Sequence, residues 1–331
     1  MTQPQSRKNQ ILKKIKVIYN PNAGKKRQVA SFSKGITLED IQELFLRYQL
    51  VAEFSPTKHK GHAVELAKEA ASDGFNIVVA AGGDGTISEV ANGLVNTDST
   101  MAILPMGTYM NTPNMLDIPT DDLEKAVMLI KLGRTRKIDV GSLTSVNGQN
   151  TSQSLYFLES AGMGIEAQFH RLFNKFESGE FISLWEMLKL PFQYFSHRAE
   201  IDIDGKILKT RATLVTISNA PFTGANLPIA PKAKLNDHRL TVSLYKMSLF
   251  EIFRYFLKYF FTIKPRDRKI ETHQGKVVRI TVEEPKMVHA DASILGFTPV
   301  EFKIIPNALE VITGFPKQGE SSLLKRTYLD P

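Results

Sequence analysis

The first part of the chain, up to about residue 140, alternates short β-branched apolar runs with longer amphipathic stretches. The short runs predict strands over residues 15–19, 51–54, 76–81 and 101–104. Between them, apolar positions recur at helical spacing and predict helices over residues 37–48, 61–72, 87–94 and 121–132. This alternation is typical of a three-layer α/β domain built on a largely parallel sheet.

Beyond residue 140 the pattern is dominated by strands. Extended runs occur at residues 155–160, 199–203, 210–218, 240–245, 277–282 and 300–305. Asp204-Gly205 is a strong two-residue hairpin signal, and helical stretches around 166–195 and 248–261 interrupt the strands. We therefore predict an α/β domain at 11–142, an antiparallel β-rich sandwich at 143–315 and a loose polar and basic tail at 316–331.

Composition limits the class of protein. A chain of 331 residues exceeds the usual size of one hydrophobic core, which agrees with two domains. No segment reaches the roughly 18 consecutive apolar residues of a membrane span, and the polar start lacks the apolar core of a secretory signal, so we expect a soluble, cytoplasmic protein. The absence of cysteine excludes disulfides, thiolate catalysis and cysteine-bound metal.

The net charge of +8 favours an anionic partner, which is a nucleotide, an acidic membrane surface or nucleic acid. The chain has no helix-turn-helix spacing, zinc-finger spacing or RNA-binding aromatic signature, so we do not expect nucleic acid to be a partner.

The most informative motif is a glycine-rich turn between a predicted strand and a predicted helix: Gly82, Gly83, Asp84, Gly85 and Thr86. Without side chains at three of these positions, backbone amides can approach an anion, and the helix directs its amino end to the same place. Asp84 adds a carboxylate that would orient a magnesium ion or a water on the phosphates. The alternative is a tight turn in which the glycines serve only geometry.

These residues resemble the diacylglycerol kinase catalytic domain family, particularly its bacterial lipid kinases, which have sphingosine and ceramide kinases as relatives. The resemblance covers nearly the whole chain, beginning at Asn20-Pro21-Asn22-Ala23-Gly24 and including Leu104 to Thr108. It implies a two-domain lipid-kinase-like fold that uses ATP and Mg²⁺. The residues that it implies for holding the nucleotide are Asn20, Asn22, Gly24, Thr57, Gly82, Gly83, Asp84, Gly85, Thr86, Glu89 and Thr108.

In the second half, residues 228–237 are similar to the family's stretch that holds a structural magnesium ion with backbone groups and an aspartate. By position the resemblance implicates Lys234, Asp237 and Arg239. Lysine and arginine would contribute only carbonyl oxygens, which leaves Asp237 as the side-chain ligand. A polar turn between strands is the alternative interpretation.

The chain departs from the family pattern at two places. Where the family has x-Asn-Asp-x-Ala-Arg after the threonine of the second loop, this chain has Tyr-Met-Asn-Thr-Pro-Asn at 109–114 and so loses an acidic group and an arginine. The family's Asp-Gly-Glu, whose glutamate is taken as the general base, corresponds to Asp291-Ala292-Ser293. In an extended segment Asp291 would lie on the same side as Ser293 and would substitute as the base; the alternative is a slow or inactive enzyme.

A stretch at 250–269 combines phenylalanines at helical spacing with lysines and arginines. It is either an interfacial segment for an anionic bilayer or a core helix followed by a solvated charge run, and the helix at 181–195 is equally ambiguous.

The function that we predict is transfer of the ATP γ-phosphate to the hydroxyl of a diacylglycerol-like lipid at an anionic membrane surface, with transient membrane association. Asp84 would organise the metal, and Asp291 is the candidate base. Two alternatives remain: an NAD kinase, which shares the Gly-Gly-Asp-Gly-Thr loop, and a catalytically impaired nucleotide- or lipid-binding protein of the same fold. The sequence predicts neither the lipid nor the oligomeric state.

Overall fold

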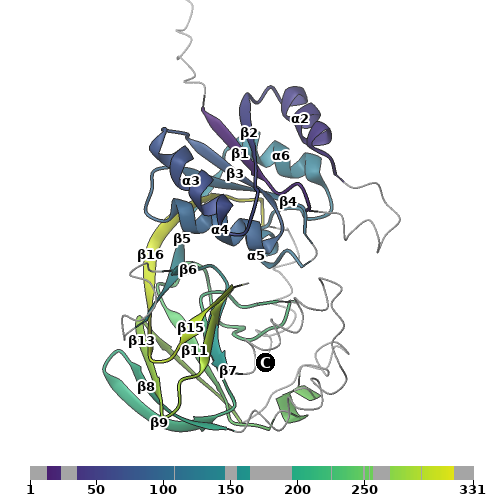
Figure 1. The fold of residues 1–331 in the computed structure, drawn as a ribbon. Coiled ribbons are helices and arrows are strands. Elements are labelled where there is room, and N and C mark those ends of the chain that lie inside the picture. Colours follow the sequence, from purple (N-terminus) through teal and green to yellow (C-terminus); the bar gives the residue numbers. More distant parts are fainter. Residues whose placement is uncertain are drawn as a thin grey trace, which may run out of the picture.

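The computed structural model describes residues 13–23, 36–107, 109–145, 155–164, 196–224, 226–248, 250–252, 254–255, 269–291 and 293–316. Within these ranges the chain forms an α/β domain from its first part and a β-rich domain from its second (Figure 1). The predicted helix at 166–195 and most of the aromatic and basic stretch that follows Phe250 lie outside the described residues.

Four parallel strands form most of the sheet in the first domain: β1 (Ile15–Tyr19), β2 (Ala52–Pro56), β3 (Ile77–Gly82) and β4 (Thr100–Pro105). Their order is β2-β1-β3-β4. All six residues of β3 are buried, as expected for a central parallel strand that is covered on both faces. The predicted strands in this region are therefore confirmed.

The helices described in this domain are α2 (Leu38–Arg47), α3 (His62–Ser72), α4 (Asp84–Leu94), α5 (Asn111–Met115) and α6 (Leu123–Leu132). Figure 1 shows α3 and α4 on one face of the sheet and α2 and α6 on the other. Thr37 begins α2 with a capping box, in which its hydroxyl accepts from the Asp40 amide at 3.2 Å. The first domain thus has the predicted three layers.

The direction in which the strands are added reverses between β1 and β3. The chain leaves β1 for the outer strand β2, whereas it leaves β3 for β4 on the opposite side. The loops that follow β1 and β3 therefore diverge to opposite faces of the sheet and leave a crevice at its carboxyl edge. In open α/β sheets, ligands bind at such a switch point.

The second domain is built from two largely antiparallel layers. One is a six-stranded sheet, which consists of β12 (Ile270–Gly275), β11 (Leu240–Tyr245), β10 (Leu214–Ser218), β7 (Ser160–Gly164), β14 (Met287–Ala290) and β15 (Ser293–Phe297). The other contains β5 (Thr135–Ser145), β6 (Leu155–Phe157), β8 (His197–Ile203), β9 (Lys206–Ala212), β13 (Val277–Val282) and β16 (Val300–Ile312). The predicted Asp204-Gly205 turn is confirmed, because Ile203 pairs with Lys206 around it.

Strand β16 joins the two domains. Its first part pairs with β13 in the second domain, and near its end Val311 pairs in parallel with Met101 of β4. It also runs antiparallel to β5, with a break in register between Ile305 and Leu309. The predicted strand covers residues 300–305, whereas β16 continues to Ile312 through a bulge between Ile305 and Leu309.

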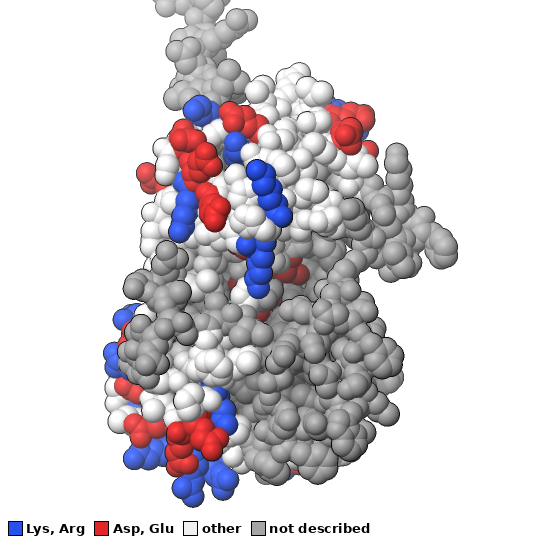
Figure 2. All heavy atoms as spheres, in the orientation of Figure 1, with Lys and Arg blue, Asp and Glu red and all other residues white. Residues whose placement is uncertain are grey.

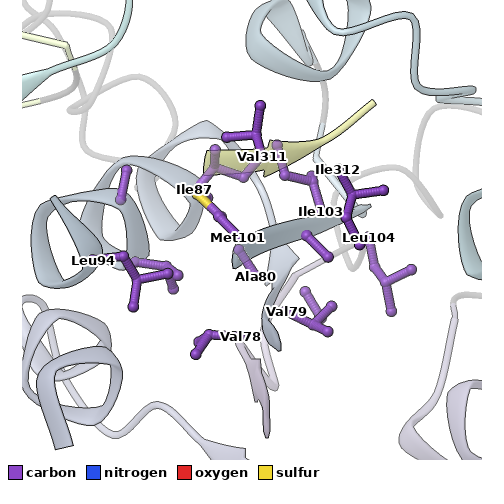
Figure 3. Close-up of a cluster of buried hydrophobic side chains, with 14 of the residues drawn as sticks. Val78, Val79, Ala80, Ile87, Leu94, Met101, Ile103, Leu104, Val311 and Ile312 are labelled. Carbon is purple, nitrogen blue, oxygen red and sulfur yellow. The ribbon is translucent and has the colours of Figure 1, made fainter. Parts of the chain in front are cut away.

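The core of the first domain incorporates this distant strand. Figure 3 shows Val311 and Ile312 of β16 packed among side chains of β3, β4 and α4, including Ile87 and Met101. All of these side chains are buried. Strand β16 thus stabilises the sheet that carries the glycine-rich loop. The predicted boundary between 142 and 143 falls inside β5.

Candidate active site

Three of the residues predicted to hold a nucleotide lie at the carboxyl edge of the parallel sheet. The Asn20 amide donates to the carbonyl of Ala81 at 3.0 Å, which joins the loop after β1 to the end of β3. The Asn20 side chain accepts from the Asn22 amide at 2.9 Å, and the Thr57 amide donates to the carbonyl of Tyr19 at 2.8 Å. Gly24 and Thr108 lie outside the described residues.

The glycine-rich loop packs closely against the loop after β4. The Met106 amide donates to the Gly82 carbonyl at 2.9 Å. A Cβ atom added at Gly107 would lie 2.7 Å from the Gly83 Cα atom, and one at Gly82 would lie 2.6 Å from the Thr86 side chain. Gly107 is therefore required for the close approach of the two loops, and Gly82 is required for the tight turn into α4. At these two positions the glycines serve geometry, as in the alternative interpretation of the motif.

Gly85 is different, because a Cβ atom there would meet no atom of the described part of the chain within 4 Å. It lies in the first turn of α4, whose N-cap Gly83 offers no capping side chain. The first hydrogen bond of the helical ladder runs from Ile87 to Gly83, so the amides of residues 84–86 have no partner within the helix. This open first turn has the geometry of a phosphate site.

Gly85→Ala tests whether the open turn binds phosphate. The added methyl group meets no atom of the described residues and should favour the helix by up to about 1 kcal/mol. It would stand where a phosphate approaches the amides, so we expect the dissociation constant for ATP to rise at least about tenfold, or 1.4 kcal/mol. Calorimetric titration with ATP and thermal unfolding of the same samples check both effects. Unchanged affinity would remove Gly85 from the site.

Glu89, on the second turn of α4, contacts the start of α3. Its two carboxylate oxygens accept from the amides of Gly61 at 2.9 Å and Ala63 at 3.3 Å. Glu89 therefore caps α3 and fixes the loop that carries Thr57. Both oxygens are engaged by the protein, so this geometry gives Glu89 a positioning role.

Glu89→Gln replaces one of these two acceptor oxygens by a donor. We expect a loss of about 1 kcal/mol in the free energy of unfolding, which is the usual contribution of a helix cap. We also expect the dissociation constant for ATP to rise about two- to fivefold, because Glu89 no longer fixes the loop that carries Thr57. Part of the lost capping free energy then also reduces the free energy of ATP binding. Urea unfolding and titration with ATP measure the two effects. A selective loss of ATP binding with full stability would instead assign Glu89 to direct contact.

Asp84 begins α4 and lies at the centre of the site. One of its carboxylate oxygens, Oδ2, accepts from the Met110 amide at 3.0 Å and so caps α5. The other, Oδ1, is buried and has no hydrogen-bond partner in the described part of the chain. Burial, with a contribution from the nearby charge of Asp291, raises the pKa of Asp84 to about 6. An unpartnered buried carboxylate oxygen is a group that a hard cation would satisfy.

Asp291 occupies the turn between β14 and β15. Ala290 pairs with Ser293, and Asp291 has a left-handed backbone (φ 45°), so the prediction of an extended segment is wrong. The physical reason is that aspartate tolerates the left-handed region and can enter a tight turn. Asp291 and Ser293 therefore do not follow one another in an extended segment. Their position on one side of such a segment was the reason to expect that Asp291 replaces the family's glutamate as the base.

The carboxylate of Asp291 joins the two domains. Its oxygens accept from the Ser88 hydroxyl of α4 at 3.0 Å and from the amides of Leu158, Glu159 and Ser160 at 2.9, 3.0 and 3.2 Å. Burial raises its pKa, and these donors oppose the rise. Since each oxygen already accepts two hydrogen bonds, the geometry favours a positioning role for Asp291 over that of a base.

A third acidic residue, Glu159, was missed by sequence reasoning. It is buried, and its oxygens accept from the Asn111 amide group at 3.0 Å and the Thr112 hydroxyl at 3.2 Å. Burial and the charges of Asp291 and Asp84 raise its pKa well above the ordinary glutamate range. The available signal was a glutamate inside the apolar run 155–160 that predicted a strand. Figure 2 shows acidic side chains between the two domains, below basic side chains of the upper one.

The described residues contain no group of three or more histidines and carboxylates arranged to hold a metal ion. Asp237 lies in the loop before β11 and accepts from the Arg239 amide at 3.1 Å, while Lys234 and Arg239 are exposed. Burial raises the pKa of Asp237. The metal site at this loop stays a prediction.

Comparison with known proteins identifies the family. Residues 14–143 match the family model of the diacylglycerol kinase catalytic domain, and residues 160–313 match that of the YegS C-terminal NAD kinase beta sandwich-like domain. The first domain of the chain belongs to the diacylglycerol kinase catalytic domain family. The two matches follow one another along the chain and agree with the predicted two-domain fold.

Individual relatives agree with this assignment. The chain is 29% identical over 318 residues to a diacylglycerol kinase of Bacillus subtilis (strain 168). The alignment covers 94% of this chain and 99% of the relative. A crystal structure of a diacylglycerol kinase from Bacillus anthracis str. Sterne has a TM-score of 0.67 at 22% identity, covering 92% of this chain and 97% of the other. A yeast NADH kinase complexed with NADH shares the fold with a TM-score of 0.51 at 11% identity. This match covers 97% of this chain and 88% of the yeast chain.

Within this family fold, the predicted residues divide into two groups. The structure brings together the loops at 20–22, 57, 82–86 and 106–107, and it adds Asp291 from about two hundred positions away. The second group lies in the loop before β11 and consists of Lys234, Asp237 and Arg239. Among the described hydrogen bonds, none joins this loop to the first group. No helix in the described part of the chain is long and apolar enough to span a membrane.

Proposed function

We propose that this protein is an ATP-dependent lipid kinase that transfers the γ-phosphate to the hydroxyl of a diacylglycerol-like lipid. The observation that carries the proposal is the open first turn of α4 at the sheet's switch point, with the unpartnered Asp84 oxygen beside it. Membership in the diacylglycerol kinase catalytic domain family supports the same chemistry.

In this proposal the amides of residues 84–86 bind phosphate oxygens, and the α4 dipole favours their negative charge. Asp84 Oδ1 is the oxygen that would hold a magnesium ion, which neutralises charge on the phosphates when bound. Asp84 Oδ2 keeps the turn at Met110 in place, so one carboxylate serves both purposes. The loop of Gly107 fixes this arrangement through its contact with Gly83.

The acceptor hydroxyl would attack the γ-phosphate in line. Phosphoryl transfer depends mainly on positioning and charge stabilisation, and a base contributes roughly 10²- to 10⁴-fold. The family's glutamate is replaced by Ser293, which cannot accept this proton at neutral pH. Asp291 is proposed here as a positioning residue that keeps the second domain against α4.

A membrane surface is the proposed location of the lipid substrate. Phe250, at the start of the aromatic and basic stretch, is 74% exposed, and the net charge of +8 would favour anionic headgroups. Sedimentation with phosphatidylglycerol vesicles should recover more protein than sedimentation with phosphatidylcholine vesicles, and the difference should vanish at high salt. Equal recovery would contradict the electrostatic part of the proposal.

One assay separates the lipid kinase from its alternatives. Purified protein receives γ-labelled ATP, magnesium and, in separate reactions, diacylglycerol, other lipid alcohols or NAD. We expect label in a lipid product and none in NADP. Label in NADP alone would support an NAD kinase, for which the shared fold of the yeast enzyme gives a structural precedent. Label in no product, together with measurable ATP binding, would support a catalytically impaired protein.

A further inference from the structure

The site has an acidic residue that the family pattern does not account for. After Thr108 the family carries Asn-Asp in the second and third positions, whereas this chain carries Met110 and Asn111. The position of the family's aspartate is thus occupied by a neutral amide, which has lost the negative charge. A carboxylate from another element lies directly against that amide.

This carboxylate belongs to Glu159, at the entry to β7 in the second domain. Its Oε2 atom accepts from the Asn111 Nδ2 group at 3.0 Å, and its Oε1 atom accepts from the Thr112 hydroxyl at 3.2 Å. The exposed fractions are 6% for Glu159 and 2% for each of its two partners. Glu159 is therefore an interior residue of the site and not a solvated side chain that happens to lie near it.

The electrostatic environment of Glu159 is unfavourable for folding. Among the described residues no lysine, arginine or histidine forms an ion pair with Glu159, Asp84 or Asp291. Burying carboxylates together with only neutral donors costs free energy, because each loses its hydration and repels the others. Destabilising arrangements of this kind are typical of functional sites, where a bound ligand supplies the missing charge.

We propose that Glu159 is a further positioning residue of the phosphoryl-transfer site. In the cation-bound state, where the positive charge stabilises its carboxylate, it supplies from the second domain the negative charge that the family pattern carries at residue 111. The acid is thus carried by the segment before β7 and not by α5, and Asn111 donates to it. Glu159 would orient Asn111 and, through the shared turn at Met110, the Asp84 carboxylate toward the cation that accompanies ATP. This inference rests on the proposed kinase function.

Glu159→Gln is the principal test, because it removes the charge and keeps the shape. The glutamine oxygen still accepts from Asn111, and its amide can donate to the Thr112 hydroxyl. We expect at least a hundredfold loss of kcat/KM and at least a tenfold rise in the magnesium concentration needed for half-maximal binding of a non-hydrolysable ATP analogue. We expect the melting temperature of the ligand-free protein to rise. A merely structural role predicts neither the kinetic loss nor the magnesium effect.

Two further variants make the test decisive. Thr112→Val removes one hydrogen bond to Glu159 and leaves the charge, so its magnesium dependence should stay within threefold of the unmodified protein. The double variant N111D/E159Q returns the carboxylate to α5, and we expect its kcat/KM to be at least tenfold higher than that of E159Q. A double variant no more active than E159Q would overturn the proposal that Glu159 takes the place of an acid at residue 111.

The inference and the underlying function fail in different ways. If the unmodified protein labels no lipid, the proposed function is wrong, whatever the variants do. If it labels lipid and E159Q keeps its activity and magnesium dependence within threefold, the proposed function stands and the role of Glu159 is wrong.

Discussion

Asp84→Asn is expected to lower kcat/KM for lipid phosphorylation by about 10²- to 10³-fold, which is the usual cost of removing one preorganised electrostatic contact to a transition state. The same substitution should stabilise the ligand-free protein by about 1–3 kcal/mol, because it removes a buried charge beside Asp291. The asparagine oxygen can still accept from the Met110 amide, so the cap on α5 is retained. Loss of function with a gain of stability is the signature of a functional carboxylate.

The stabilisation by Asp84→Asn depends on pH in a defined direction. The pKa of Asp84 is about 6 in the folded protein and about 3.9 in the unfolded chain, so the folded state binds the proton more tightly. The contribution of Asp84 to stability is therefore most favourable below pH 4 and is lost as pH rises through 6. Urea unfolding should show the largest difference between variant and unmodified protein at pH 7.5 and almost none at pH 4.

The matched control is Asp122→Asn, which removes a partly exposed carboxylate at the start of α6. The pKa of Asp122 is lowered, mainly by donation from the Lys125 amide, so this substitution should lower stability slightly and leave activity unchanged. If Asp84→Asn destabilised the protein or kept full turnover, Asp84 would be a structural cap and not the centre of the site.

Asp291→Asn should have the opposite effect on stability, with an expected loss of about 2–4 kcal/mol in the free energy of unfolding. The carboxylate accepts four hydrogen bonds, and an amide nitrogen in place of one oxygen would face donors of the protein. Leaving buried donors unpaired costs about 1–3 kcal/mol each, more than the repulsion that is relieved. Activity should fall because the second domain loosens from α4.

Two measurements distinguish this positioning role of Asp291 from the base role expected from the sequence. Urea unfolding gives the stability, and initial rates at a temperature where the variant is fully folded give the activity. Ser88→Ala, which removes one of the four donors, should reproduce a smaller part of the loss in stability. Full stability of Asp291→Asn with loss of activity would restore Asp291 as the candidate base.

The parallel-sheet domain could be predicted from the sequence because its signals are local. The run that forms β3, the glycine turn and the apolar face of α4 follow one another within twenty residues, and each pattern corresponds to one element. Thr37 at the start of α2 is a comparable case, since its capping box involves only residues 37 and 40.

The rest depended on pairings between distant residues. Val311 pairs with Met101 across about two hundred positions, and the local sequence of β16 does not indicate that this strand crosses into the first domain. The function of Glu159 depends on Asn111 and Asp291, which are distant in the chain. Asp291 was misplaced because Asp-Ala lacks the glycine that usually identifies a two-residue turn.

A crystal structure with a non-hydrolysable ATP analogue and magnesium tests the central claim most directly. We expect phosphate oxygens within about 2.7–3.2 Å of amides in the first turn of α4, as hydrogen bonds require. We expect the cation at about 2.0–2.2 Å from Asp84 Oδ1, as magnesium requires. A triphosphate bound away from residues 82–86, or an Asp84 Oδ1 atom that stays without a ligand in the complex, would contradict the account.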